Sequence, residues 1–327
     1  MRLRRSKPHK KGYGRRRAGA GFRYVDQAGR PIHDRETVRR LRSLVIPPAW
    51  EDVWISPDPR GHIQAIGTDA AGRRQYLYHP EWRVRRDTAK FDHVLAVSRR
   101  LPRLRRQVTR DLRGRGLTRA RVLAAVVRLL DMGEFRIGGD AYASGEEPSY
   151  GITTLLPSHL RARSGCVVLE FTAKGGITQE STVDDPDVCA VLRDLRRRRR
   201  RADRLFAYWA GRRWHDVKAD EVNAYLREVT GTDMTAKDFR TWHATLLAAV
   251  VLADTGVAPT AAKRKRVVAG VMREVADLLG NTPTVARASY VDPRVLHRYE
   301  DGVVADATPA AKRETQERAV RKLLSDS

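Results

Sequence analysis

The chain has 327 residues, with 64 Lys and Arg against 39 Asp and Glu, which gives a formal net charge of +25. Hydrophobic residues make up 41% of the chain, so it can form a sizeable core, which excludes wholesale disorder. So large a positive charge favours a polyanionic partner, with nucleic acid as the first candidate and an anionic membrane surface as the second. The length suffices for two ordinary domains.

Membrane insertion and secretion are disfavoured. The longest apolar run, residues 246–253, is far shorter than the ~20 residues of a spanning helix. The N-terminus lacks the apolar stretch of a signal peptide. The two cysteines, Cys166 and Cys189, form neither a disulfide framework nor a CxxC metal motif. We therefore expect a cytoplasmic, nucleoid-associated protein without structural zinc.

Residues 1–20 carry nine Lys or Arg and no acidic residue. Such a composition is typical of a solvated, disordered arm. The arm could be a solubilising tail, or it could contact DNA phosphates, and the sequence leaves both possibilities open.

Residues 21–88 are predicted to form a small β-rich domain. Tyr24 and Val25, followed by the turn residues 26–29, resemble the start of a hairpin. A helix is expected at residues 35–44, before Pro47 and Pro48. Further short strands, separated by turn clusters, are expected at residues 53–55, 62–66 and 75–78.

Residues 89–327 follow a helical period and are predicted to form a second, mainly helical domain. Thr118 can cap a helix with apolar positions from Val122 to Leu130. A β-hairpin is expected where residues 167–171 and 177–183 flank the turn Lys174-Gly-Gly. Six arginines, residues 196–201, extend a predicted helix either as a solvated face or as a contact to the DNA backbone. Further helices are expected near residues 90–100, 186–210, 219–229, 236–254 and 261–280.

Several segments, in family-like order and spacing, resemble the motifs of bacterial and poxvirus-like type IB DNA topoisomerases, and the resemblance covers roughly residues 21 to 300. The catalytic-type motifs are Arg136-Ile-Gly-Gly-Asp-Ala-Tyr142 with Ser149-Tyr-Gly-Ile-Thr-Thr-Leu155, Phe171-Thr-Ala-Lys174-Gly-Gly, Thr235-Ala-Lys-Asp-Phe-Arg240-Thr-Trp-His-Ala, and Leu279-Gly-Asn281-Thr-Pro-Thr-Val-Ala-Arg-Ala-Ser-Tyr290. The small-domain motifs are Ile46-Pro-Pro-Ala-Trp50, residues 57–62 and Gly72-Arg-Arg-Gln-Tyr-Leu-Tyr-His79.

The resemblance implies a role for five residues in breaking and resealing a phosphodiester. Tyr290 would attack the phosphate and form a 3′-phosphotyrosyl link. Arg136 and Arg240 would bind the non-bridging oxygens, because a planar guanidinium matches two phosphate oxygens. Lys174 would protonate the departing 5′-oxygen. Asn281 stands where many members carry histidine, and it can donate only a neutral hydrogen bond.

The resemblance also implies DNA contacts outside the reaction centre. His243, one helical turn after Arg240, is either a general base or, as we favour, a residue that supports the site or packs in its helix. Without the motifs, each proposed catalytic or DNA-contacting residue would be an ordinary core, turn or surface residue. The implied DNA contacts are Arg73, Arg74, Gln75, Tyr76, Tyr78 and Tyr142.

The fold class implied is α+β: a small β-rich N-terminal domain and a mainly α-helical catalytic domain with a β-hairpin, closing as a monomeric C-shaped clamp around double-stranded DNA. No Walker A pattern and no acidic cluster with two-metal spacing is present, so we expect neither ATP nor a metal cofactor. Two alternatives remain. A tyrosine recombinase uses the same set of catalytic residues, Arg, Lys, Arg and Tyr. A non-enzymatic DNA-coating protein would explain the positive charge.

Overall fold

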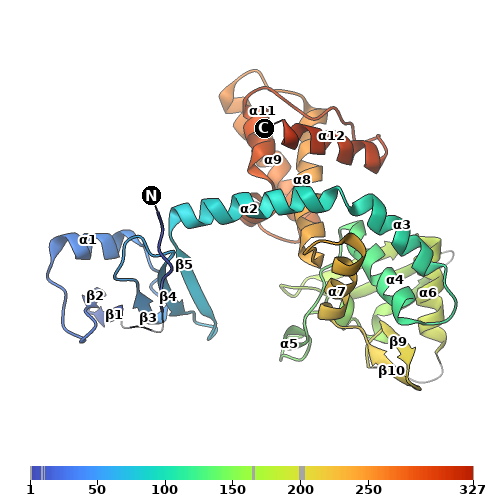
Figure 1. Cartoon of the computed structure of the whole chain (residues 1–327), viewed down its shortest axis with the longest axis horizontal. Coiled ribbons are helices and arrows are strands. Elements are labelled where there is room, and N and C mark those ends of the chain that lie inside the picture. The colour runs from blue at the N-terminus through green and yellow to red at the C-terminus, as the bar shows by residue number, and fades with distance from the viewer. Residues whose placement is uncertain (1, 9, 11, 164–165, 199–202, 327) are drawn as a thin grey trace. The chain divides into compact units, whose positions relative to one another are not determined.

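A computed structural model describes residues 2–8, 10, 12–163, 166–198 and 203–326. The chain folds into two compact units, residues 1–91 and 92–327 (Figure 1). Helix α2 (Pro80–Ser98) runs through the boundary between them. The boundary expected at residues 88 and 89 falls in the same helix.

The N-terminal unit is built on a five-stranded antiparallel sheet with strand order β2-β1-β3-β4-β5. Helix α1 (Arg35–Ser43) begins where the Asp34 carboxylate accepts a hydrogen bond from the amide of Thr37 at 2.7 Å. Its buried Leu41 packs with Ile55 and Ala65 of the sheet. The strands are β1 (Tyr13–Ala18), β2 (Gly21–Val25), β3 (Glu51–Ile55), β4 (Ile63–Thr68) and β5 (Arg74–Tyr78).

The prediction of a disordered basic arm at residues 1–20 is wrong. Strand β1 lies inside this segment and pairs with β2 on one side and with β3 on the other. The Arg15 guanidinium donates hydrogen bonds to the carbonyls of Ile46, Pro47 and Trp50, each at 2.8 Å, and lies over the ring of Phe22. The composition misled because a strand bonded through its backbone tolerates basic side chains.

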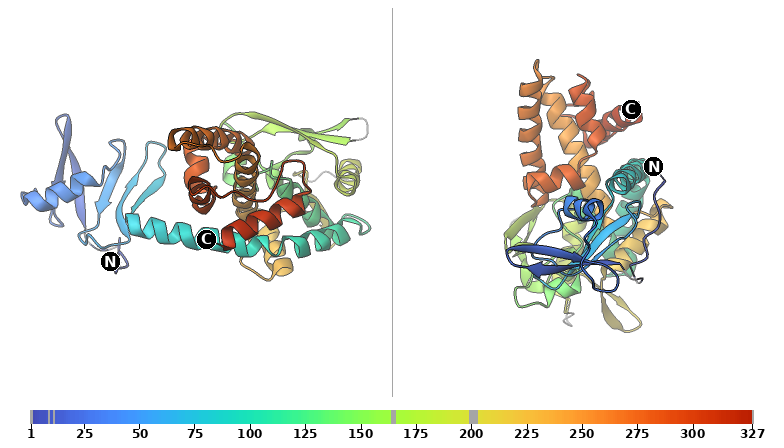
Figure 2. Two further views of the ribbon diagram at one scale, coloured as in Figure 1. Left: turned by 90° about the horizontal axis from the view of Figure 1, so that it is seen from above. Right: turned by 90° about the vertical axis from the view of Figure 1, so that its left-hand side faces the viewer.

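The second unit is mainly helical. Helix α4 is buried along most of its length, and its Thr118 cap accepts from the amide of Arg121, as predicted. Helices α8, α9, α11 and α12 form one group, while α4, α6 and α7 lie with the small sheets (Figures 1 and 2). The helices are α3 (Leu101–Leu112), α4 (Arg119–Met132), α5 (Asp140–Ala143), α6 (Pro186–Arg197), α7 (Ala219–Thr230), α8 (Ala236–Thr255), α9 (Ala261–Leu279), α10 (Pro283–Ser289), α11 (Pro293–Glu300) and α12 (Arg313–Ser325).

Two small antiparallel sheets complete this unit. The predicted hairpin is confirmed: β7 (Cys166–Thr172) and β8 (Thr178–Val183) flank the Lys174 turn, and β6 (Leu160–Arg163) adds a third strand. The helix expected at residues 186–210 ends early, at Arg197, and β9 (Ala207–Ala210) pairs with β10 (Arg213–Asp216) instead. Half of the arginine run, residues 199–201, lies outside the described residues.

Candidate active site

Two arginines from distant segments meet at the C-terminal end of α9. Arg136, in the loop after α4, donates hydrogen bonds from Nη2 to the carbonyls of Leu279 at 2.9 Å and Gly280 at 2.7 Å. Arg240, on α8, donates from its own Nη2 to the Leu279 carbonyl at 2.7 Å. The last carbonyls of a helix have no partner within it and carry partial negative charge, so they attract cations.

No carboxylate compensates these two cations. Within the described part of the chain, neither guanidinium lies within ion-pair distance of an acidic side chain. Burial lowers the pKa of Arg240, and the neighbouring charge of Arg136 lowers it further, whereas the phenol of Tyr290 acts in the opposite direction. Two adjacent, uncompensated guanidinium groups form a place where an anion such as a phosphate can bind.

Asn281 approaches the same carbonyl. Gly280 ends α9 in the left-handed conformation, with φ of 57°, and turns the chain so that the amide of Asn281 donates to the Ala276 carbonyl at 2.9 Å. The side-chain Nδ2 of Asn281 lies 3.4 Å from the Leu279 oxygen. Asn281 therefore approaches the same Leu279 carbonyl as both arginines.

Tyr290 ends the short helix α10 and lies beside Arg240. The guanidinium carbon of Arg240 is 5.5 Å from the centre of the Tyr290 ring. The buried Thr245, also on α8, donates from Oγ1 to the backbone carbonyl of Tyr290 at 3.2 Å and accepts from the amide of Asp292 at 3.1 Å. Helix α8 thus supplies both the cation next to the tyrosine ring and an anchor for its backbone.

Lys174 is exposed in the turn between β7 and β8. The turn needs glycine, because Gly175 and Gly176 have φ of 90° and 74°, in the left-handed region. A pocket of about 400 Å³ is lined by Lys174, Arg136 and Leu279, among other residues. The structure therefore brings Lys174 to the same pocket as Arg136, without a direct contact between the two side chains.

Four of the predicted DNA contacts, Arg74, Gln75, Tyr76 and Tyr78, lie on β5 in the N-terminal unit. The rings of Tyr76 and Tyr78 stack with their centres 6.1 Å apart, and the Arg74 guanidinium lies 5.9 Å from the centre of the Tyr76 ring. Tyr76 is 43% exposed. An exposed cation and stacked aromatic rings on one strand are a surface to which a nucleic acid can bind.

The remaining predicted contacts differ in availability. Arg73 forms an ion pair with Asp69 at 2.9 Å, and the Gln75 amide donates to the same carboxylate at 2.8 Å. Hydrogen bonds from the backbone and side chain of Arg73 and from Gln75 lower the pKa of Asp69 to about 2. Tyr142, on α5 of the second unit, is 68% exposed. Arg73 and Gln75 are thus both engaged with Asp69, while Tyr142 is accessible.

Comparison with known sequences agrees with this geometry. Residues 79–317 match the family described as eukaryotic DNA topoisomerase I, catalytic core, and residues 21–69 match the bacterial DNA topoisomerase IB N-terminal domain. The chain belongs to the type IB DNA topoisomerases. A relative among characterised proteins, DNA topoisomerase 1B of Acanthamoeba polyphaga mimivirus, is 29% identical over 272 residues, which cover 81% of this chain and 80% of the relative.

These matches favour a topoisomerase over a tyrosine recombinase or a DNA-coating protein, because both regions of the chain match topoisomerase families. Both the enzyme class and the α+β fold class are confirmed. Among the described residues, no helix is long and apolar enough to cross a membrane. The roles of individual residues and the C-shaped arrangement around DNA stay predictions.

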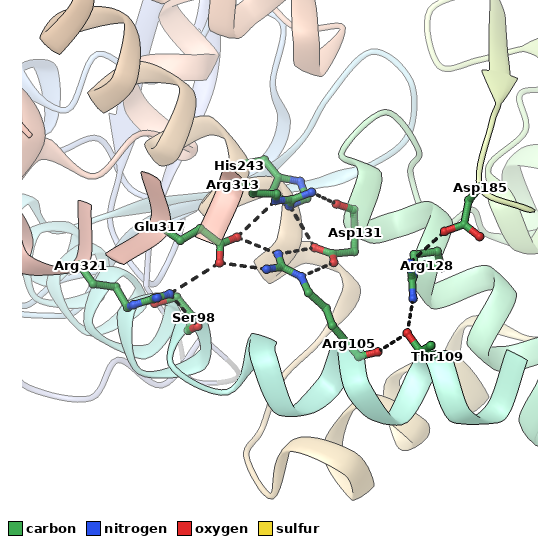
Figure 3. A network of polar contacts seen from close by, with 10 residues as sticks. All are labelled: Ser98, Arg105, Thr109, Arg128, Asp131, Asp185, His243, Arg313, Glu317 and Arg321. Carbon is green, nitrogen blue, oxygen red and sulfur yellow. Dashed lines mark hydrogen bonds and ion pairs between the residues drawn. The ribbon is translucent and has the colours of Figure 1, made fainter. Parts of the chain in front are cut away.

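Sequence reasoning missed Thr245, Asp131 and Arg313 near this site, and it left the role of His243 open. Thr245 gave no signal, since it is one threonine in a helix rich in small residues. His243 is buried, and its Nε2 lies 3.4 Å from Asp131 and also contacts Arg313 (Figure 3). These contacts favour a supporting role for His243 over that of a general base for Tyr290.

Proposed function

We propose that this enzyme relaxes supercoiled double-stranded DNA by transesterification through Tyr290, acting as a monomer and without ATP or a metal ion. One observation supports this most: Arg136 and Arg240 meet beside the Tyr290 ring with backbone carbonyls as acceptors and no carboxylate partner among the described residues. A scissile phosphate in this place would supply the missing negative charge. The transferred bond conserves the energy of the broken one, so resealing needs no external source of energy.

The proposed reaction proceeds in two balanced steps. The Tyr290 phenol loses its proton to solvent and its oxygen attacks phosphorus, while the bond to the 5′-oxygen breaks and Lys174 gives a proton to that oxygen. The strand end then rotates under torsional strain. The free 5′-hydroxyl returns its proton to Lys174 and attacks the phosphotyrosine, and the Tyr290 oxygen leaves and regains a proton from solvent. Arg136 and Arg240 stabilise the charge that develops on the non-bridging oxygens in both directions.

Binding of the substrate would use both units. Net charge of +25 makes phosphate contacts the main source of affinity. We assign Arg74, Tyr76 and Tyr78 of β5 to contacts made by the N-terminal unit, and Tyr142 of α5 to contacts made by the catalytic unit. The positions of Arg73 and Gln75 beside Asp69 make them weaker candidates for direct contact.

The test is relaxation of a supercoiled plasmid in EDTA without ATP, comparing wild type with Tyr290→Phe. We expect the wild type to relax DNA and to leave a protein–DNA adduct on denaturation. The variant should form no adduct and lose at least roughly a thousandfold in rate, because it lacks the nucleophile.

Tyr208→Phe is the matched control, because it removes a hydroxyl that donates to Glu221 at 2.9 Å elsewhere in the same unit. It should relax DNA like the wild type. Relaxation by Tyr290→Phe at the wild-type rate would assign the nucleophile elsewhere. DNA binding without relaxation by the wild type would support a recombinase or a coating protein.

A further inference from the structure

A cluster of charged residues surrounds two buried carboxylates between four helices of the catalytic unit. We call it the buried charge network; Figure 3 draws its members together with neighbouring polar residues. Arg105 donates from Nε to Asp131 at 2.7 Å and from Nη2 to Glu317 at 2.7 Å, so its guanidinium bridges two carboxylates. The Glu317 side chain is fully buried, with 0% of its surface exposed. The members are Arg105 on α3, Asp131 on α4, His243 on α8, and Arg313, Glu317 and Arg321 on α12.

Both carboxylates are held ionised in this interior position. Burial alone would raise the pKa of Asp131, but hydrogen bonds from His243 and Arg105 and the charge of Arg313 outweigh it and keep this pKa well below its ordinary value. The pKa of Glu317 is also lowered. Burial alone would raise it, but the hydrogen bonds and the charge of Arg105 outweigh burial. Removal of Arg105 or Arg313 would therefore leave the two buried carboxylates with less compensating charge.

Helix α12 contacts the end of α4 through Arg313. Its Nη1 donates to the backbone carbonyl of Asp131 at 2.8 Å, and its Nη2 donates to the carboxylate of the same residue at 3.0 Å. Arg313 also contacts His243 of α8. A side chain from the C-terminal part of the chain thus caps one helix and touches a second.

Both helices lead directly to the candidate active site. After Asp131 the chain turns at Gly133, with φ of 96°, and reaches Arg136 three residues later. The His243 ring packs on that turn, since a Cβ at Gly133 would lie 2.8 Å from Nδ1. On α8, His243 follows Arg240 by one helical turn. The network therefore joins the two elements that carry the arginines.

We propose that Arg313 and Glu317 are positioning residues for DNA cleavage: they hold the end of α4 against α8, so that Arg136 and Arg240 reach the same phosphate. The inference rests on the proposed function. It assigns α12 a part in the reaction, although none of its residues lies among the predicted catalytic residues. A merely stabilising α12 would affect unfolding and leave the chemical step of the folded enzyme unchanged.

The experiment measures single-turnover cleavage, at saturating enzyme, of a short duplex whose downstream fragment, which carries the new 5′-hydroxyl, dissociates after cleavage. Arg313→Ala is compared with Arg318→Ala, which removes the same charge from an exposed position of the same helix. Each is assayed below its unfolding transition. We expect Arg313→Ala to lower the cleavage rate constant by roughly 10- to 100-fold, because a small misplacement of reacting groups has such an effect. DNA affinity should match that of Arg318→Ala.

A second substrate separates positioning from stability. It carries a methyl group in place of one non-bridging oxygen of the scissile phosphate, which removes the charge that the two arginines neutralise. If Arg313 acts through them, the ratio of wild-type to Arg313→Ala rates shrinks on this neutral substrate, as it should for Arg240→Ala. Equal ratios on both substrates would overturn the proposal.

The remaining outcomes are also decisive. Arg313→Lys and Glu317→Gln preserve side-chain size and replace Arg313→Ala if that variant does not fold. Cleavage by these variants at the rate of Arg318→Ala, with an adduct formed by the wild type, would refute positioning and leave the proposed function intact. If the wild type forms no adduct, the proposed function itself fails, and this inference fails with it.

Discussion

Two groups of arginines in the catalytic unit use the same side chain in opposite ways. In the buried charge network, Arg105 and Arg313 lie 2.7 to 3.0 Å from buried carboxylates. At the candidate active site, Arg136 and Arg240 donate to backbone carbonyls and face each other without an acidic partner among the described residues. The partner, rather than the residue type, distinguishes an arginine that supports the fold from one that is available to phosphate.

The largest expected effect comes from breaking the paired group. Arg105→Ala leaves Asp131 and Glu317 buried without their shared cation, which should lower the free energy of unfolding by about 3–5 kcal/mol. Urea unfolding measures the loss. The neighbouring exposed Arg106→Ala should change stability by less than about 0.5 kcal/mol. Equal losses for the two variants would mean that the buried pairing contributes little.

Breaking the unpaired group should affect chemistry more than folding. Arg240→Ala should lower the cleavage rate by roughly 10²- to 10³-fold, because it removes a donor aimed at developing charge. The loss in stability should be small, since Arg136 still donates to the Leu279 carbonyl. Single-turnover cleavage and urea unfolding of the same preparation test both halves. Arg240→Lys keeps the charge without the planar fork and should restore only part of the rate.

Lowering the pH should destabilise the folded protein through the buried charge network. Burial lowers the pKa of His243, and the charge of Arg313 lowers it further, against a hydrogen bond with Asp131 that raises it. The folded protein therefore resists a proton that the unfolded chain accepts, and stability should fall as pH drops below about 6.5. The lowered pKa values of Asp131 and Glu317 add a further loss below about 4.

Thermal unfolding of the wild type and of His243→Gln between pH 5 and pH 8 measures the histidine contribution. The slope near neutral pH should flatten in the variant, which has no titrating group at this position. A variant with an unchanged slope would place the acid sensitivity elsewhere in the molecule.

The smallest effect extends the comparison to the N-terminal unit. Arg74 lies over Tyr76 without an acidic partner among the described residues, whereas Arg73 is paired with Asp69. Arg74→Ala should reduce the slope of log affinity against log salt by about 0.9, the value for one lost phosphate contact. Arg73→Ala should reduce it less. Titrations of a fluorescent duplex at several salt concentrations decide between them, and equal slopes would remove the distinction.

The sequence points to the proposed reacting groups more clearly than to the residues that support them. Arg136, Lys174, Arg240 and Tyr290 stand in local motifs, and local patterns also predicted the Lys174 hairpin and the helix capped by Thr118. The network gave no such signal, because Arg105 and Glu317 are 212 residues apart in sequence. Ion pairs of this kind depend on tertiary packing, which no periodicity encodes.

Composition also misled at two places. Basic residues suggested a disordered arm where β1 forms. The arginine-rich sequence predicted a helix that continued into β9, but β9 is a strand that pairs with β10. In both cases the deciding interaction is a backbone partner from another segment. Without such a partner, the strand propensity of a segment predicts its structure poorly.

Strand β1 also bears on how this family varies. It lies between β2 and β3, while the recognised N-terminal domain begins only at residue 21. A free tail can lengthen, shorten or lose its charges at little cost, but a segment with neighbours on both sides cannot. We expect relatives to keep the length of this strand and an arginine at the place of Arg15, and to vary the outward-facing basic residues around it.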